Sequence, residues 1–511
     1  MADTLAATPR TLRLHPSDNV LVCIDRSSDG VRLAESVVTL DRIPRGHKVA
    51  ARDIALGEPV LKFGQVIGLA KEQIRRGKWV HEHNTAMTPS EHAVERHPDF
   101  DRFAPFPDNQ RATFQGYRRA SGKAGTRNYI GILTSVNCSA TVARFIAREV
   151  ERSGILADYP NVDGVVPFVH GTGCGMADTG EGYDILNRTQ WGYAANPNLG
   201  GTLVVGLGCE VFQIGRFKKE YGFDENPTFR THTIQDTGGT RAAVEEGLRR
   251  IHEMLPAVNA AKRETLPASE LMLALQCGGS DGYSGITANP ALGVASDMLV
   301  RHGGTSILSE TPEIYGAEHL LLARAATDEV GRKLRSRLAW WDDYTAKRGG
   351  EMNNNPSPGN KLGGLTTILE KSLGAVAKGG QAPMMEVYEY AEPVTTHGFV
   401  FMDTPGFDPV SATGQVAGGA NILCFTTGRG SAYGNKPVPS IKLATSTDLY
   451  NRMKEDMDIN CGDVLEGVSL EEKGREIFAT ILRVASGERT KSEQLGYGDA
   501  EFVPWQVGAV M

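Results

Sequence analysis

The chain has 511 residues, too many for a single hydrophobic core, so its length predicts about three domains. Apolar residues make up 40% of it, which supports well-packed globular domains, and the net charge of −7 argues against a nucleic-acid partner. No apolar stretch approaches the roughly 20 residues that cross a membrane, and the first residues lack the apolar core of a signal peptide. We therefore expect a soluble, cytoplasmic protein.

Short alternating apolar and polar segments fill the first part of the chain. Segments such as LRLHPSDNVLVCI and GEPVLKFGQVIGLA are broken by glycine and proline, and no long helical pattern appears among them. We predict a small all-β domain over residues 1–88. Residues 89–112 are rich in proline and charge and are predicted to form a linker.

From residue 113 onward, strand-like runs alternate with helical patterns. This alternation predicts an α/β domain over 113–262 and another over 268–511, both with mostly parallel sheets. Ser139 is expected to cap the helix that follows it. One long helix is expected over 317–347 and a closing helix over 469–488. The apolar C-terminal tail and the frequency of symmetric oligomers favour a homo-oligomer.

Four of the seven cysteines stand in glycine-rich turns directly after apolar, strand-like runs. In an open α/β sheet, ligands bind at such strand ends. The odd number of cysteines and the lack of a CxxC pair argue against disulfides or a zinc ribbon. Cys23 and Cys424, inside strand-like runs, are expected to be buried packing residues. The four strand-end cysteines are Cys138, Cys174, Cys209 and Cys277.

Three other side chains with metal-binding chemistry, His170, Glu210 and Asp281, stand near these cysteines in the sequence. Thiolate, imidazole and carboxylate groups together form a ligand set for iron, manganese or zinc. Three cysteines are also enough to suggest an iron–sulfur cluster. The residue types therefore leave a single metal ion and a cluster both open.

Polar groups also gather in the N-terminal domain and in two later loops. His81 and His83 alternate, so they would share one face of a strand and could bind one metal or anion together with His47, although chance placement stays open. The tracts NPSPGNKLGG and FTTGRGSAYG place lysine or arginine among glycines and hydroxyls. Such groups suit the carboxylate and hydroxyls of a substrate, and they equally suit plain surface turns.

Several longer motifs then carry a specific resemblance. GHKVAARDI with HEHN, GTRNYIGILTSVNC, VVGLGCE, QCGGSDGYSGITANPALG, NPSPGNKLGG and TTGRGSAYG occur in this order. With these motifs the chain resembles the altronate dehydratase and galactarate dehydratase family from about residue 11 to its C-terminus. The resemblance implies that the N-terminal β domain is a SAF (β-clip) domain, whose histidines would take part in the reaction if it closes over the active site.

The resemblance implies a hydro-lyase that removes water from a sugar acid such as altronate or galactarate and gives a 2-keto-3-deoxy acid. It also implies ferrous iron as cofactor, with manganese as a substitute. A divalent cation would polarise the carboxylate while a base takes the α-proton and an acid protonates the departing hydroxyl. The matching residues are assigned as catalytic groups (His47, His81, His83, Lys361), substrate-binding groups (Ser280, Asp281, Asn355, Ser357, Asn360, Thr427, Arg429) and metal ligands (Cys138, His170, Cys174, Cys209, Cys277).

Alternatives to this interpretation remain. HEHN resembles the altronate branch and GTRNYIGILTSVNC the galactarate branch, so the sugar acid is open. The related sulfolactate sulfo-lyase eliminates sulfite instead of water, but its two parts are separate chains. A non-catalytic sugar-acid binding protein is disfavoured by the complete set of cysteines with Lys361 and Arg429. A nicotinamide-dependent oxidoreductase is disfavoured because GLG is only part of a GxGxxG motif.

Overall fold

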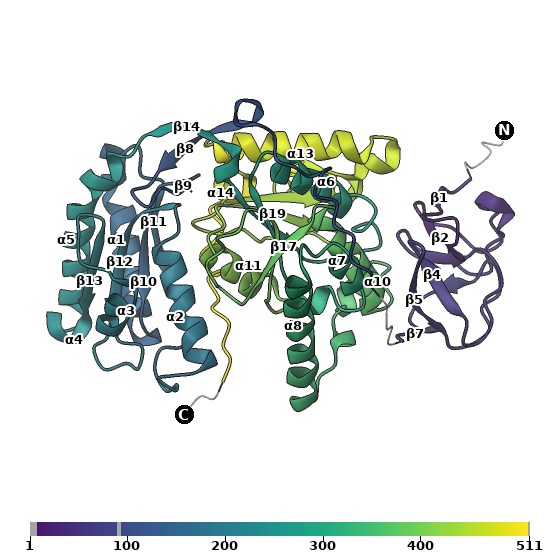
Figure 1. Cartoon of the computed structure of the whole chain (residues 1–511), viewed down its shortest axis with the longest axis horizontal. Coiled ribbons are helices and arrows are strands. Elements are labelled where there is room, and N and C mark those ends of the chain that lie inside the picture. The colour runs from purple at the N-terminus through teal and green to yellow at the C-terminus, as the bar shows by residue number, and fades with distance from the viewer. Residues whose placement is uncertain (1–7, 89–93, 509–511) are drawn as a thin grey trace.

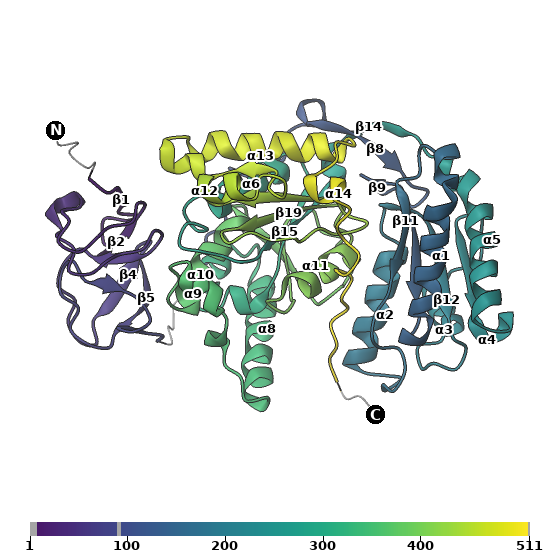
Figure 2. The same cartoon turned by 180° about the vertical axis from the view of Figure 1, so that it is seen from behind.

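The computed structural model describes residues 8–88 and 94–508. Three bodies follow one another along the molecule, with the N-terminal domain at one end, the second domain at the other end and the C-terminal domain between them (Figures 1 and 2). No helix in the described ranges is long and apolar enough to cross a membrane.

The N-terminal domain consists of small antiparallel sheets, as the sequence predicts. Branched apolar residues such as Val20, Val49 and Ile67 are fully buried. One sheet has the order β1-β2-β3-β6 and the other β4-β5-β7. The strands are β1 (Thr11–Leu12), β2 (Val20–Cys23), β3 (Lys48–Ala50), β4 (Pro59–Lys62), β5 (Gln65–Ala70), β6 (Trp79–Val80) and β7 (Thr85–Ala86).

The second domain has a four-stranded parallel sheet with the order β11-β10-β12-β13. Its strands are β10 (Tyr129–Thr134), β11 (Gly164–Phe168), β12 (Leu199–Gly206) and β13 (Phe229–Thr233). Its helices are α1 (Ala140–Ser153), α2 (Glu181–Ala194), α3 (Ile214–Tyr221), α4 (Ile234–Thr237) and α5 (Thr240–Asn259). Ile130 and Ile132 pack toward α1 and α5, whereas Tyr129 and Leu133 face α2, so both faces of the sheet are covered.

A three-stranded antiparallel sheet lies where the chain enters and leaves the second domain. Its order is β14-β8-β9, with β8 (Thr113–Arg118), β9 (Ala124–Gly125) and β14 (Arg263–Pro267). Because β8 and β14 pair along their length, the two crossings between domains are held side by side.

The C-terminal domain is built on a seven-stranded sheet with the order β17-β18-β16-β15-β19-β20-β21. All its pairs are parallel, so every strand ends at the same edge. The strands are β15 (Met272–Cys277), β16 (Thr305–Leu308), β17 (Met384–Tyr388), β18 (Gly398–Met402), β19 (Ile422–Thr427), β20 (Ser440–Ala444) and β21 (Ile459–Asn460). The predicted class, a small β domain followed by α/β regions with parallel sheets, is thus confirmed.

Helices cover both faces of this sheet. Leu273 and Leu275 share a core with α6 and α13, whereas Ala274 and Leu423 share one with α11. The helices are α6 (Ala288–Arg301), α7 (Glu318–Leu322), α8 (Asp328–Lys347), α9 (Pro358–Leu362), α10 (Ile368–Val376), α11 (Asp408–Ala417), α12 (Thr447–Arg452), α13 (Leu470–Ala485) and α14 (Lys491–Gln494). The C-terminal segment then runs between the two α/β domains, where Trp505 stacks on Trp341 with 5.5 Å between ring centroids.

Two local predictions are wrong. The long helix expected over 317–347 is divided into α7 and α8, because the Thr327 hydroxyl accepts the Val330 amide and starts a new helix. Ser139 does stand at the start of α1, but its hydroxyl donates to the Val136 carbonyl 2.8 Å away and makes no capping bond.

Candidate functional site

The predicted metal ligands lie at the carboxyl edges of two different sheets. Cys138, Cys174 and Cys209, here called the cysteine trio, follow β10, β11 and β12 of the second domain, whereas Cys277 ends β15 of the C-terminal domain. The trio is exposed and Cys277 is buried, and all four are free thiols. The structure therefore presents two separate donor sets, and which of them holds a metal stays a prediction.

The loops that carry the cysteine trio are bound to one another. The Asn137 amide donates to the Thr172 carbonyl at 3.0 Å, and the Phe212 amide donates to the Gly173 carbonyl at 3.1 Å. Gly173 has a φ of 98°, and a Cβ there would lie 2.1 Å from the Ser135 carbonyl oxygen. Only glycine permits this approach, which sets the three loops against each other.

His170 and Glu210, beside the cysteine trio, hold these loops in place. His170 Nε2 lies 2.7 Å from the Thr134 carbonyl oxygen, and its Nδ1 accepts a hydrogen bond from the backbone amide two residues further along the chain. Burial lowers the pKa of His170 to about 4. Glu210 accepts the amides of Leu207 at 3.1 Å and Gly208 at 2.6 Å. Both ring nitrogens of His170 bond to the backbone here, and its role as a metal ligand stays a prediction.

At the carboxyl edge of the seven-stranded sheet, five ionisable residues form what we call the buried cluster: Cys277, Glu310, Glu313, Lys371 and Lys378. Lys378 Nζ donates to Cys277 Sγ at 2.8 Å, and the thiol donates to Glu313 Oε2 at 3.1 Å. Lys371 Nζ lies 2.6 Å from Glu313 Oε1, and Lys378 Nζ lies 3.5 Å from Glu310 Oε2. Three acidic groups and two ammonium groups thus share a site without solvent.

The charges within the buried cluster are unequal. Burial opposes ionisation of Glu313, but Lys371 and Lys378 outweigh it and lower the Glu313 pKa to about 2. Burial and the charge of Glu313 raise the pKa of Glu310 and that of the Cys277 thiol well above their ordinary values. With Glu313 charged and both Glu310 and Cys277 protonated, two ammonium groups face one carboxylate.

Glu310 has the conformation of a strained functional residue. It directly follows Ser309, the first residue after β16, and has a φ of 71°, which non-glycine residues rarely adopt. Its amide donates to the Thr404 hydroxyl at 2.9 Å. Both its carboxyl oxygens are buried without a hydrogen-bond partner. Such unsatisfied polar atoms in an apolar interior indicate a missing ligand or a catalytic role.

The N-terminal domain docks against this same edge through a buried ion triad. Lys48 and Lys62 lie 2.9 and 2.8 Å from the two oxygens of Glu370, the residue next to Lys371 on α10. The Lys48 ammonium also donates to the Gly364 carbonyl at 2.7 Å. Burial opposes ionisation of Glu370, but the two lysines outweigh it and hold its pKa far below its usual range. The domain therefore covers the edge that carries the buried cluster.

Of the three predicted catalytic histidines, two lie in this interface. His47 Nδ1 accepts the Trp79 indole at 3.2 Å, so its Nε2 carries the proton and faces the Leu362 carbonyl at 3.2 Å. His81 stacks on Trp79 with 5.2 Å between ring centroids, and burial lowers the pKa of His47 and of His81 to about 4. His83 is exposed, and its ring centroid lies 5.2 Å from that of Trp79.

The predicted NPSPGNKLGG tract forms the contact between the two domains. Ser357 and Asn360 form a capping box at the start of α9, and Asn360 Nδ2 donates to the Ser280 carbonyl at 2.9 Å. Lys361 reaches the N-terminal domain, where it pairs with Glu82 at 2.7 Å. The Asn355 side-chain oxygen accepts a hydrogen bond from the ammonium group of Lys371, which belongs to the buried cluster. Most predicted polar groups of this tract therefore have partners within the protein.

The remaining predicted substrate-binding residues, Ser280, Asp281, Thr427 and Arg429, meet where β15 and β19 end. Asp281 is buried, and its Oδ1 accepts the Tyr283 amide at 3.1 Å and the Ser284 amide at 3.0 Å, which shapes the loop. Arg429 is exposed and lies against Gly279. Within the described residues it forms no ion pair. It is therefore a cation at this edge that is available to an anionic ligand.

Sequence reasoning missed four charged residues of this edge: Glu310, Glu313, Lys371 and Lys378. Glu310 carried the same signal as Cys277, since both come at or just after the end of a β-like run. Lys371 carried a weaker signal, because it stands beside Glu370 in the mostly apolar segment that forms α10. Nothing in the sequence pairs these lysines with Cys277, whose contacts with Lys378 span 101 positions.

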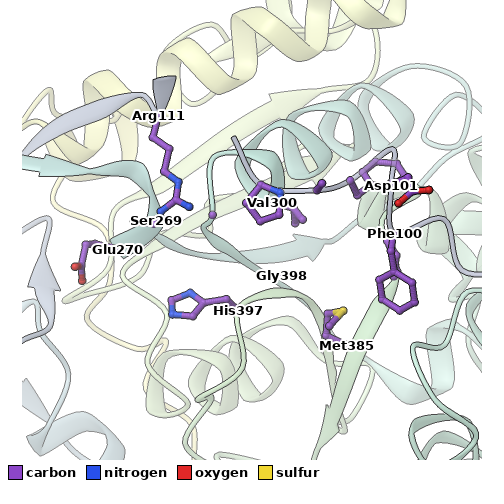
Figure 3. Close-up of a pocket in the computed structure, with 14 residues that line it drawn as sticks. Phe100, Asp101, Arg111, Ser269, Glu270, Val300, Met385, His397 and Gly398 are labelled. Atoms are coloured by element: carbon purple, nitrogen blue, oxygen red, sulfur yellow. The ribbon is translucent and has the colours of Figure 1, made fainter. Parts of the chain in front are cut away.

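The sizes of the cavities do not by themselves locate the substrate site. A void of only about 10 Å³ lies between Ser280, Asp281 and Lys371. A far larger cavity of about 730 Å³ is lined by Phe100, Arg111, Met385 and His397, among others (Figure 3). It lies where β16 and β18 begin, at the edge opposite to the buried cluster, so we do not assign the chemistry to it.

Comparisons with known proteins match most of the chain. Family models match residues 9–88 (altronate/galactarate dehydratase SAF domain), 116–259 (D-galactarate dehydratase/altronate hydrolase, second domain) and 268–510 (D-galactarate/altronate dehydratase, C-terminal). Galactarate dehydratase (L-threo-forming) of Escherichia coli (strain K12) is 40% identical over 95% of this chain and 94% of its own length. Altronate dehydratase of Bacillus subtilis (strain 168) is 36% identical over 94% and 96%. The beta subunit of (2R)-sulfolactate sulfo-lyase of Chromohalobacter salexigens is 32% identical over 76% and 96%.

Proposed function

Because the chain belongs to the galactarate/altronate dehydratase family of hydro-lyases, we propose that it removes water from a sugar acid such as galactarate or altronate to give a 2-keto-3-deoxy acid. The observation that carries this proposal is the meeting, at one covered sheet edge, of an unpaired arginine, a buried acid–lysine cluster and the SAF domain. We assign substrate binding to the arginine, proton transfer to the cluster and exclusion of water to the SAF domain.

Substrate binding is assigned to Arg429. A guanidinium can bind a carboxylate with two parallel hydrogen bonds, and Arg429 stands exposed beside the glycine loop that follows Cys277. Holding the carboxylate there would direct the α-carbon toward the buried cluster. Lys361, already paired with Glu82, is less suited to this role.

We assign proton transfer to the lysines of the buried cluster and to a histidine of the SAF domain. Removing the α-proton needs a base, and expelling the β-hydroxyl needs an acid. Lys371 and Lys378 are ammonium groups held by Glu313 and Cys277, so either can donate a proton or stabilise negative charge on the enediolate. His81, kept neutral by burial, is the histidine of the SAF domain best placed to accept one, since its hydrogen bond to Thr366 is long at 3.5 Å.

The residues of the buried cluster fit the ferrous ion that the family implies. Ligand atoms of Cys277, Glu310 and Glu313 lie within 4.8 Å of one another, and thiolate with carboxylate suits Fe²⁺ or Mn²⁺. Burial keeps protons on Cys277 and Glu310, and one divalent cation could replace those two protons without changing the net charge. A bound cation would polarise the substrate carboxylate and make the α-proton more acidic.

The SAF domain contributes exclusion of water. Its buried Lys48 and Lys62 hold it to Glu370, and His47 reaches the Leu362 carbonyl, so the docked domain shields the buried-cluster side of the site while Arg429 stays exposed. A shielded site strengthens the electrostatic contacts inside it and protects the enol intermediate. The void of about 10 Å³ is smaller than a sugar acid, so a substrate that reaches the buried cluster would need the docked surfaces to separate.

The test is an anaerobic assay with ferrous iron in which galactarate and altronate are offered separately and formation of 2-keto-3-deoxy product is followed. Product from either supports the proposal. Release of sulfite from sulfolactate, with no product from the sugar acids, would favour the sulfo-lyase reaction instead. Binding of the sugar acids without turnover of any of the three compounds would favour a non-catalytic binding protein.

A further inference from the structure

The second domain carries a donor set that the proposed hydro-lyase site does not use. The cysteine trio comes from three loops at adjacent strands of one sheet, and all three thiols are exposed. The other four cysteines are buried. Thiols that are free and convergent at the ligand-binding edge of a parallel sheet point to a bound metal group.

Other possible ligands at this edge are already engaged. Both nitrogens of His170 bond to the backbone, and both oxygens of Glu210 accept bonds within the loops. The Ser135 hydroxyl adds a further bond to Glu210. These residues fix the loops and leave three thiols as the available ligands, which is how an outer shell supports a metal site.

The three sulfur atoms do not lie close enough together for one ion to bind all of them without movement of the loops. A single tetrahedral ion binds each sulfur at about 2.3 Å, which places its ligands close together. Within the described residues, Cys277, Glu310 and Glu313 meet a 4.8 Å mutual limit, whereas the cysteine trio does not. A cluster distributes its thiolates over separate iron atoms and so spans a wider gap.

Local polarity at this edge also suits an anionic cluster. Cys138 stands directly before α1, a helix of 14 residues whose N-terminus favours negative charge. Gln235 Nε2 donates to Cys209 Sγ at 3.4 Å, the kind of hydrogen bond that stabilises cluster-bound sulfur. We propose that Cys138, Cys174 and Cys209 hold a [4Fe–4S] cluster in which one iron has no protein thiolate. Because the edge is open to solvent, that iron takes an oxygen ligand from solution.

The test is purification of the full chain without oxygen, reconstitution with ferrous iron and sulfide, and measurement of iron, acid-labile sulfide and visible absorption. We expect about four sulfide per chain and about four iron in addition to the ferrous ion proposed for the buried cluster, with the broad sulfur-to-iron absorption of a cluster. Electron paramagnetic resonance after reduction gives a readout that does not depend on activity.

Single substitutions Cys138→Ser, Cys174→Ser and Cys209→Ser should each remove most of the sulfide and the visible absorption. Cys277→Ser is the matched control, since it is also a strand-end cysteine, and it should retain both. Failure of the hydro-lyase proposal would appear in the sugar-acid assay and leave these signals intact. Iron without sulfide, tightly held zinc, or trio variants that keep the full cluster signal would each overturn the inference.

Discussion

The carboxyl edges of the two parallel sheets share an architecture but present different chemistry. At the C-terminal domain the edge is covered by the SAF domain, and its Cys277 is buried among carboxyl and ammonium groups. At the second domain the edge is open, and its cysteine trio is exposed on loops that His170 and Glu210 hold in place. We infer that burial selects the chemistry: under the proposals above, the covered edge carries proton transfer and carboxylate activation, whereas the open edge carries ligation by thiolates.

The largest effect should come from the buried thiol. Cys277→Ser removes the thiol that links Lys378 to Glu313, and we expect sugar-acid turnover to fall about a thousandfold, since a positioned proton-transfer group contributes about that much. Steady-state kinetics and circular dichroism are the measurements. The control, Cys424→Ala, removes an equally buried thiol and should retain turnover. Full activity in Cys277→Ser would remove this cysteine from the covered site.

The next effect concerns docking of the SAF domain. Glu370→Gln leaves Lys48 and Lys62 buried without a counter-charge, and breaking a buried ion pair in this way costs about 3–5 kcal/mol. We expect a lower urea midpoint for the first unfolding transition. Glu82→Gln breaks the exposed pair with Lys361 and should change stability by less than about 1 kcal/mol. Equal effects of the two variants would mean that the triad does not hold the domains together.

A smaller effect is expected from the exposed arginine of the covered edge. Arg429→Ala should lower kcat/KM about a hundredfold, mainly through KM, because a charge-assisted contact to the substrate carboxylate is lost. Arg152→Ala, on the second domain, serves as the control because its side chain is 70% exposed and pairs only with Glu149. An unchanged KM in Arg429→Ala would assign carboxylate binding to another group.

Acidification should weaken the covered edge gradually. Burial lowers the pKa of His47 and His81 to about 4, so the folded state binds fewer protons than the unfolded state between pH 6.5 and 4. Their contribution to stability is complete above about pH 6.5 and is lost as the pH falls toward 4. Thermal melting against pH should show this decline, with a shallower slope in His81→Asn. An identical slope in that variant would contradict the assignment.

Sequence patterns identified residues that lie at the two sheet edges, but not the distant residues that they contact. The rule that ligands gather at strand ends placed Cys138, Cys174, Cys209 and Cys277 correctly after β10, β11, β12 and β15. The same rule applied to Glu310 would have added it, because it too follows a strand end. Lys378 could not be found in this way, since its contact with Cys277 depends on how α6, α10 and β15 pack.

What the sequence by itself determined is the class of fold, the family and the strand ends at which chemistry lies, because hydrophobic periodicity and local turn residues act over short stretches of chain. Only the tertiary structure decided that the four strand-end cysteines divide into two sets, that the SAF domain docks through Lys48, Lys62 and Glu370, and that Glu310 is left without a hydrogen-bond partner. Burial and the distance between charges set those outcomes, and both depend on residues hundreds of positions apart.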